Sequence, residues 1–224
     1  MQSTISRRAF INRTLTAAAA AGATWFDVPD ILAKNATTRA ESIKKFGGFQ
    51  MGIQSYSLRA FGVEGAVEKI ADLGLHWVEF FRAHYPQTGD RKKVNEMNAL
   101  LKKFDISISA HGVQSFTKDH SKNEAFFKFA KLAGIRNISA NPQPDSFESL
   151  DKLVKAYDIR IAIHNHGPTH LYDKAKDVHK AVQKWDKRIG FCADLGHYIR
   201  SGDDPVEVVH LLGERLSVEG HPAH

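Results

Sequence analysis

Residues 159–168 read Ile-Arg-Ile-Ala-Ile-His-Asn-His-Gly-Pro, an apolar run that ends abruptly in polar side chains and a Gly-Pro turn. Short runs rich in Ile, Val, Phe or Trp and bounded by turn residues are typical of β-strands. Five more runs of this kind recur about every 28 residues along the chain: Gln50–Leu58, Leu75–Phe81, Ile106–Val113, Ile135–Asn141 and Ile189–Asp194. The sequence therefore predicts six strands.

The segments between these runs have the spacing of amphipathic helices. Apolar residues recur every three or four positions in residues 63–71 and again in residues 175–185. Asp204 and Pro205 form a typical helix start, whereas Gly74 and Gly134 stand where helices should end. Strands that alternate with helices predict βαβ units and a parallel sheet.

Two architectures contain such units, an open doubly wound sheet and a (β/α)₈ barrel. No G-x-G-x-x-G and no G-x-x-x-x-G-K-[ST] motif follows a predicted strand, so the phosphate loops of open-sheet nucleotide binders are absent. His111, His164 and Asp194 each come five residues after the first residue of an apolar run. This spacing predicts one common depth, the C-terminal rim of a barrel. We expect an α/β fold of the (β/α)₈ TIM-barrel type with about six βα units.

The length of 224 residues is short for such a barrel. Residues 49–216 hold six units, and two more would need roughly 56 residues that the tail at 217–224 does not supply. The expectation is an incomplete barrel, explained by a frameshifted or prematurely stopped gene, a fragment, or a subunit that a partner completes. Two exposed sheet edges would favour aggregation or pairing in a homo-oligomer.

The N-terminal 23 residues have the composition of a signal peptide. They contain three Arg and no acid, and Ser6-Arg7-Arg8 followed by Phe10 resembles a bacterial twin-arginine signal. We expect export to the periplasm, with a signal peptide at 1–23 and a linker at 24–48. The apolar run at 17–23 is too short for a stable membrane span.

Charge and cysteine content exclude other classes of site. The formal net charge is +6, but without residues 1–23 the excess of basic side chains is 28 − 25 = +3, which gives little support for a nucleic-acid partner. The single cysteine, Cys192, excludes an internal disulfide framework and a Cys-rich metal site.

Several polar residues at strand ends are candidates for chemistry. His164 and His166 are two positions apart, so in extended geometry they face the same side, where imidazole can serve as metal ligand or general base. Asp194 and His197 could place a carboxylate and a second imidazole near a common point. His111 could equally be a ligand or a structural residue. Glu79 interrupts an apolar strand and is either a site group or paired with Arg82.

From Met51 to Leu216 the chain resembles the xylose-isomerase-like TIM-barrel family of sugar phosphate isomerases and epimerases. The similarity rests on residues 52–59 (Gly-Ile-Gln-Ser-Tyr-Ser-Leu-Arg), 163–167 (Ile-His-Asn-His-Gly), 194–197 (Asp-Leu-Gly-His) and 201–205 (Ser-Gly-Asp-Asp-Pro). It implies a divalent metal, Mn, Co, Mg or Zn, at the strand ends. Asp194 matches a metal ligand and His197 a substrate-contacting histidine, while His164 stands where family members carry a Glu ligand that also transfers protons.

The resemblance implies a sugar or sugar phosphate isomerase or epimerase that uses a divalent metal and removes a proton next to a carbonyl. Asp194, His164 and His111 are the predicted ligands, and His164, His166, His197 and Glu79 the predicted catalytic groups. Two alternatives stay open. The chain could be an inactive barrel remnant that lacks the last two strands and their ligands, or an endonuclease of the same superfamily that acts at abasic sites.

Overall fold

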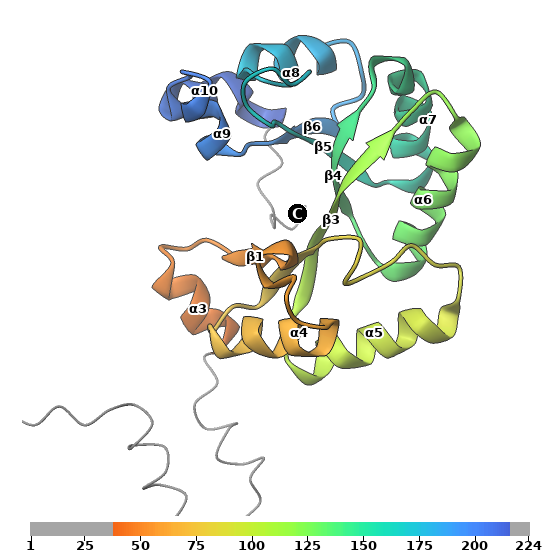
Figure 1. The fold of residues 1–224 in the computed structure, drawn as a ribbon, viewed down its shortest axis with the longest axis vertical. Helices are drawn as coiled ribbons and strands as arrows, with labels where there is room; N and C mark the ends of the chain where they lie inside the picture. The colour runs from red at the N-terminus through yellow and green to blue at the C-terminus, as the bar shows by residue number, and fades with distance from the viewer. Residues whose placement is uncertain (1–37, 216–224) are drawn as a thin grey trace, which may run out of the picture. The chain divides into compact units, whose positions relative to one another are not determined.

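The computed structural model describes residues 38–215, which form one parallel six-stranded sheet. The strands lie side by side in chain order (Figure 1): β1 Gly52–Gln54, β2 Trp77–Phe80, β3 Ser107–Phe116, β4 Asn137–Pro142, β5 Arg160–His164 and β6 Ile189–Cys192. Six predicted strands are thus confirmed, and the fold is of the α/β TIM-barrel type with about six βα units. The predicted signal peptide and the tail at 217–224 lie outside the described residues.

Helices follow the strands and cover the outer side of the sheet (Figure 1). Their bounds are α4 Val63–Asp72, α5 Arg91–Lys103, α6 His120–Ala133, α7 Phe147–Tyr157, α8 Ala175–Val182, α9 Leu195–Arg200 and α10 Pro205–Leu212. Short 3-10 turns occur at Ser55–Leu58 (η1), Pro144–Ser146 (η2) and Gly213–Arg215 (η3). No helix within residues 38–215 is long and apolar enough to cross a lipid bilayer.

Local sequence signals explain where the helices begin and end. Asp204 caps α10, because its Oδ1 accepts hydrogen bonds from the backbone N–H groups of Val206 (2.8 Å) and Glu207 (3.1 Å). Gly74 and Gly134 follow α4 and α6 with φ of +70° and +72°, the left-handed conformation that glycine adopts without a steric penalty. These predicted caps and stops are confirmed.

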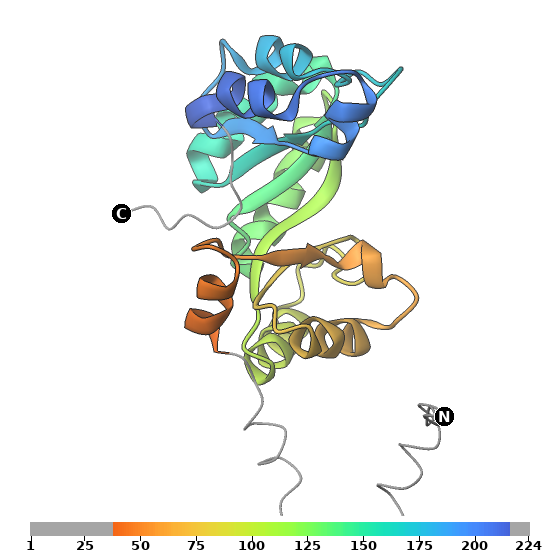
Figure 2. The same ribbon diagram turned by 90° about the vertical axis from the view of Figure 1, so that its left-hand side faces the viewer.

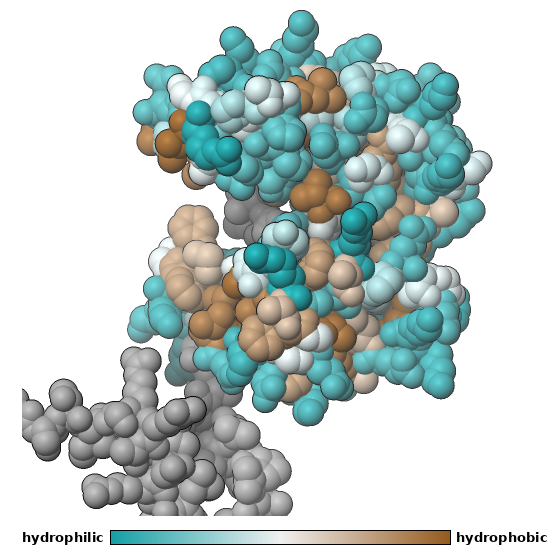
Figure 3. Space-filling model, viewed as in Figure 1, coloured by the Kyte–Doolittle hydropathy of each residue, from teal (hydrophilic) through white to brown (hydrophobic). Residues whose placement is uncertain are grey.

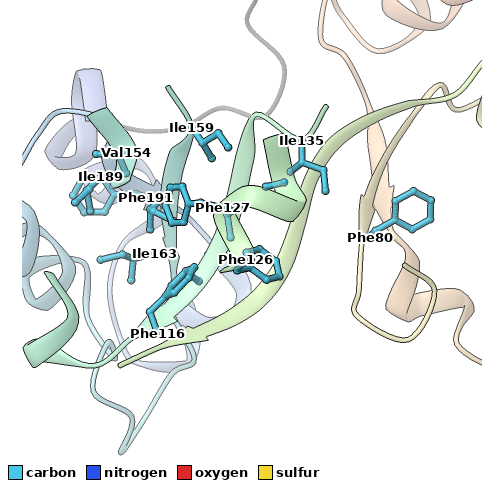
Figure 4. Packing of buried hydrophobic residues seen from close by; sticks show 14 of the residues in the cluster. Phe80, Phe116, Phe126, Phe127, Ile135, Val154, Ile159, Ile163, Ile189 and Phe191 are labelled. Atoms are coloured by element: carbon cyan, nitrogen blue, oxygen red, sulfur yellow. The ribbon is translucent and has the colours of Figure 1, made fainter. Parts of the chain in front are cut away.

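The hydrophobic core lies between the sheet and its helices. Side chains alternate along each strand, so that Phe80, Ile138, Ile161, Ile163 and Phe191 point outward into the helix layer and are buried. Figure 4 shows Ile163 and Phe191 near Phe116, Phe126 and Phe127. Burial of each such side chain stabilises the fold by about 1.5–3 kcal/mol.

The inner face of the sheet is polar by comparison. Gln54, Glu79, Ser139 and His164 occupy the strand positions that alternate with the outward core residues. The register pairs Ser139 of β4 with Ala162 of β5, so His164 lies two residues above that level. One pleat repeat of about 6.6 Å therefore separates these two layers along the strand.

Strands β1 and β6 are the two edges of the sheet within residues 38–215. In Figure 2 both edge strands face the viewer, with β1 in the lower half and β6 in the upper half of the view. Large apolar side chains are exposed near both edges. They are Phe49, Met51, Tyr56 and Phe61 beside β1, and Leu195, Ile199, Val206, Val209 and Leu211 on α9 and α10. Figure 3 shows apolar residues over α9 and α10.

The described part of the predicted linker at 24–48 contains a helix, α3 (Arg39–Lys45). Thr38 and Glu41 form a capping box at its start. The Ser42 hydroxyl donates to the Gly74 carbonyl oxygen (3.0 Å), and Arg39 donates to the Asp105 side chain (2.9 Å). These contacts attach α3 next to the N-terminal ends of β2 and β3. Packed structure therefore begins before Phe49, within the segment that the sequence predicted to be a linker.

Candidate functional site

Three side chains converge at the C-terminal ends of β5 and β6. Asp194 Oδ2 lies 3.9 Å from His164 Nε2 and 3.7 Å from His197 Nε2. Both distances are longer than a direct hydrogen bond and suit an intervening water or hydroxyl group. The imidazole of His164 has limited exposure, and its Nδ1 is buried without a hydrogen-bond partner among the described residues. The structure thus brings together three residues that the sequence predicted for the site.

Asp194 is held by backbone contacts on both sides. The buried amide of Asn165 donates to the Asp194 carbonyl oxygen (3.0 Å) and accepts from the Asp194 N–H (2.8 Å). The other carboxylate oxygen of Asp194, Oδ1, accepts from the His197 N–H (2.9 Å) and caps α9. Since Oδ1 is used by the helix and the backbone is fixed by Asn165, Oδ2 alone faces the two imidazoles.

His166 and His170 extend this group of imidazoles. The ring centroids of His164 and His166 lie 4.8 Å apart, as predicted from their spacing, and those of His166 and His170 lie 5.4 Å apart. Burial lowers the pKa of His166, and the neighbouring His164, His170 and His197 lower it further. His166 is therefore neutral near pH 7 and has a lone pair that can accept a proton.

A set of hydrogen bonds joins the loop after β5 to the turn after α9. Lys174 Nζ donates to the Ser201 carbonyl oxygen and lies 3.3 Å from Asp203 Oδ1, while Asp203 Oδ2 accepts from the Ala175 N–H (2.9 Å). The Ser201 hydroxyl donates to Asp173. These contacts fix the segment that carries His166 against the segment that carries His197.

The structure does not bring His111 to this site. His111 pairs in register with Ile138, which pairs with Ile161, which pairs with Ile189. It therefore lies three residues below the level of His164 and on the outward face. Its Nε2 donates to the Tyr85 carbonyl oxygen (2.8 Å), and its ring packs against Phe126 and Phe129. The prediction that His111 lies at the same depth as His164 is wrong. Counting residues from the start of each apolar run does not include the stagger between neighbouring strands of a barrel.

His111 should instead make folding stability pH-dependent. Burial lowers its pKa below the ordinary 6.5, so the unfolded chain binds a proton more readily than the folded chain. Stability is then full above pH 6.5 and falls as the pH drops through that value toward the folded-state pKa. Urea unfolding of His111→Phe at about pH 8 and about pH 5 should show a smaller acid loss than the natural chain.

The exposed His210 provides the control for this measurement. His210→Gln should keep the acid loss of the natural chain. His111→Phe itself should cost about 1–3 kcal/mol at both pH values, because the Tyr85 carbonyl loses its buried donor. An equal acid loss in the natural chain and in His111→Phe would contradict the structural role assigned to His111.

Glu79 is a buried carboxylate on the inner face of the sheet. Within the described residues its hydrogen-bond partners are Gln54, whose Nε2 donates to Oε1 (3.0 Å), and Ser139, whose hydroxyl donates to the same oxygen. Arg82 is not among them. Both bonds involve Oε1, so Oε2 keeps its capacity to accept a hydrogen bond. Glu79 is thus placed one layer below the histidines rather than beside them.

Gly112 makes the contact between Glu79 and Ser139 possible. Strand β3 lies between β2 and β4, and a Cβ atom at Gly112 would overlap both the hydroxyl and the carbonyl oxygen of Ser139. The carbonyl carbon of Ser139 would lie only 3.0 Å from that Cβ. The missing side chain therefore allows two non-adjacent strands to share a hydrogen bond.

The predicted set of metal ligands is not assembled among residues 38–215. No group of three or more His, Cys, Asp or Glu side chains in this part of the chain is arranged to hold a metal ion. Asp194 and His164 come together, but the third predicted ligand, His111, faces the helix layer. The described donors thus do not fit the metal site that the resemblance implies.

Asn165, His170 and Arg200 also belong to the site but were not predicted from the sequence. Asn165 lies between two histidines and carries no signal that its amide pairs with the Asp194 backbone. The ring of His170 lies next to that of His166, but no motif or periodicity in the sequence marks it. Arg200 follows His197 by three residues, and its Nη1 lies 3.1 Å from His197 Nδ1. This helical spacing is the one signal that could have identified it.

Known structures share this fold. The chain matches an uncharacterised protein from Parabacteroides distasonis with a TM-score of 0.62 and 25% identity, over 75% of this chain and 72% of the other. It matches a xylose isomerase-like TIM barrel/4-hydroxyphenylpyruvate dioxygenase fusion protein with a TM-score of 0.59 and 18% identity, over 70% and 28% of the two chains. It matches 3-keto-D-glucoside 4-epimerase from E. coli with a TM-score of 0.59 and 12% identity, over 73% and 75%.

No protein-family model and no curated protein sequence matches the chain. The likeness to the solved structures extends over about three quarters of the chain. At these levels of identity it establishes the fold, which is that of the xylose isomerase-like TIM barrels, as the sequence predicted.

Proposed function

We propose that the chain carries the site of a sugar isomerase or epimerase, formed by His164, His166, Asp194 and His197. The observation that supports it most is the position of Asp194 Oδ2 within 4 Å of two imidazole nitrogens without a direct hydrogen bond to either. Such a group can exchange water for the hydroxyl and carbonyl oxygens of a sugar. The TIM-barrel fold adds support, since active sites of this fold lie at the C-terminal ends of the strands.

The proposed reaction moves a proton at a carbon next to a carbonyl. His166, neutral because of its lowered pKa, accepts the proton, and the electron pair of the C–H bond forms an enediolate. Return of the proton to the neighbouring carbon, with transfer of the hydroxyl proton to the former carbonyl oxygen, gives an isomer. Delivery of a solvent proton to the opposite face of the original carbon, while His166 releases its proton to solvent, gives an epimer. Asp194 Oδ2 orients a substrate hydroxyl. Glu79 Oε2 is available to accept a hydrogen bond from a sugar hydroxyl that extends below the histidines, toward the layer of Glu79.

No step is assigned to a metal ion, because the described donors do not form a site with three ligands. We therefore expect isothermal titration with Mn²⁺, Co²⁺, Mg²⁺ or Zn²⁺ to show binding no tighter than millimolar, a free energy of about 4 kcal/mol. Asp194→Asn would then leave the titration unchanged. Micromolar or tighter binding that Asp194→Asn abolishes would contradict this expectation and would place a metal at Asp194.

The proposal is tested with a panel of ketoses and aldoses, free and phosphorylated, incubated with the full chain and analysed by NMR for isomeric products. We expect turnover of at least one sugar, and a loss of about 10²–10⁴-fold on His166→Gln. His179→Gln, on α8 away from the strand ends, is the matched control and should keep full turnover. Activity that is equal in both variants would contradict the assignment of His166.

A further inference from the structure

We propose that Arg200 is a positioning residue that fixes the tautomer of His197. Arg200 Nη1 lies 3.1 Å from His197 Nδ1, within hydrogen-bond distance. A guanidinium carries only N–H donors and does not lose its proton in proteins. In a neutral imidazole, the nitrogen that receives this bond carries the lone pair, so the ring proton lies on Nε2.

The surroundings of His197 agree with this assignment. Its Nε2 faces Asp194 Oδ2 at 3.7 Å, an acceptor toward which an N–H can point. On the Nδ1 side lies Gly167, where a Cβ atom would come within 3.3 Å of Nδ1. The rings of His164 and His166 lie with their centroids 6.0 and 6.1 Å away. Glycine at 167 thus leaves the Nδ1 edge open to the guanidinium.

The tautomer decides what His197 can do. With the proton on Nε2, the imidazole presents an N–H donor to the space between Asp194 and His164. Asp194 Oδ2 presents an acceptor to the same space. A hydroxyl needs an acceptor and a carbonyl oxygen needs a donor, so this pair can hold adjacent hydroxyl and carbonyl groups of a sugar. This last step rests on the proposed function, whereas the tautomer does not.

The tautomer is measured by ¹⁵N NMR of the full chain labelled at histidine, because protonated and unprotonated ring nitrogens give different signals. His197→Gln identifies the signals of His197. We expect a protonated Nε2 and an unprotonated, hydrogen-bonded Nδ1. In Arg200→Met, which has no donor, the Nδ1 signal should move to its unbonded position and the Nδ1–H tautomer should become populated. Arg200→Lys, which keeps a donor, should restore the original pattern.

Arg59→Met is the matched control, since Arg59 is exposed and donates to the Tyr56 carbonyl oxygen on the β1 side. It should leave the His197 signals unchanged. The proposal is overturned if the natural chain carries the proton on Nδ1, or if Arg200→Met keeps a pure Nε2–H form. The far-ultraviolet circular dichroism of each variant verifies folding, which the exposed position of Arg200 should preserve.

Kinetics separate this proposal from the proposed function. With a sugar that the natural chain converts, Arg200→Met should lower kcat by about 10-fold with little change in KM, and Arg200→Lys should recover most of it. An unchanged kcat beside an altered tautomer would contradict the use of the His197 tautomer in turnover and would leave the positioning by Arg200 standing. If no sugar is converted but the tautomer responds as expected, the proposed function fails and the assignment of the tautomer stands.

Discussion

Asp194→Asn should lower sugar turnover by about 10²–10⁴-fold while the protein stays folded. The carboxylate offers Oδ2 to two imidazoles and to a substrate hydroxyl, and an amide at this position would present either a neutral oxygen or an N–H donor. A donor facing the Nε2–H of His197 would repel it. The measurement is steady-state turnover of the sugar identified in the substrate panel.

Folding should survive because asparagine caps helices as well as aspartate does. The capping role of Asp194 uses Oδ1, which the asparagine oxygen can replace in accepting from the His197 N–H. Asp204→Asn is the matched control, because Asp204 caps α10 in the same way on an exposed turn. Equal turnover in the two variants would contradict the role of Asp194.

Gly112→Ala should destabilise the fold by about 3 kcal/mol or more, the upper range for overpacking a filled core. Its Cβ would overlap the hydroxyl and the carbonyl oxygen of Ser139. The carbonyl belongs to the β4 backbone and cannot rotate away, so β3 and β4 would have to separate. The effect is measured as a fall in the midpoint of thermal unfolding, by about 6–12 °C for a chain of this size.

Gly89→Ala is the control for Gly112→Ala. Gly89 lies in an exposed loop with no atom within 4 Å of an added Cβ, so its substitution should change stability by no more than about 0.5 kcal/mol. Because Ser139 also donates to Glu79, Gly112→Ala should displace Glu79 as well. Equal unfolding midpoints for the two variants would show that β3 and β4 are not packed as described.

Periodicity and turn chemistry were sufficient to predict the six strands and the parallel sheet. An apolar run buried on one side of a strand is a local property, and so is a cap such as Asp204. The pairing of His164 with Asp194 was predictable because His164 is the last residue of β5 and Asp194 follows the end of β6 by two residues. Strand ends of a parallel sheet meet at one edge, which brings such residues together.

Features that depend on the register between strands could not be predicted in this way. His111 has the same local signal as His164, yet the stagger of β3 relative to β5 places it lower and on the outer face. The partners of Glu79 depend on a glycine in an intervening strand, a contact over 60 residues of sequence. The position of α3 likewise results from contacts with distant loops.

Exchange of solvent deuterium into the sugar tests the central proposal most directly. In D₂O, an enzyme that removes a proton next to the carbonyl returns a deuteron, and NMR of the recovered sugar detects it. We predict deuterium at that carbon with the natural chain and with Asp204→Asn, and about 10²-fold less with Asp194→Asn and His166→Gln. Equal incorporation by all four proteins would contradict proton transfer at this site.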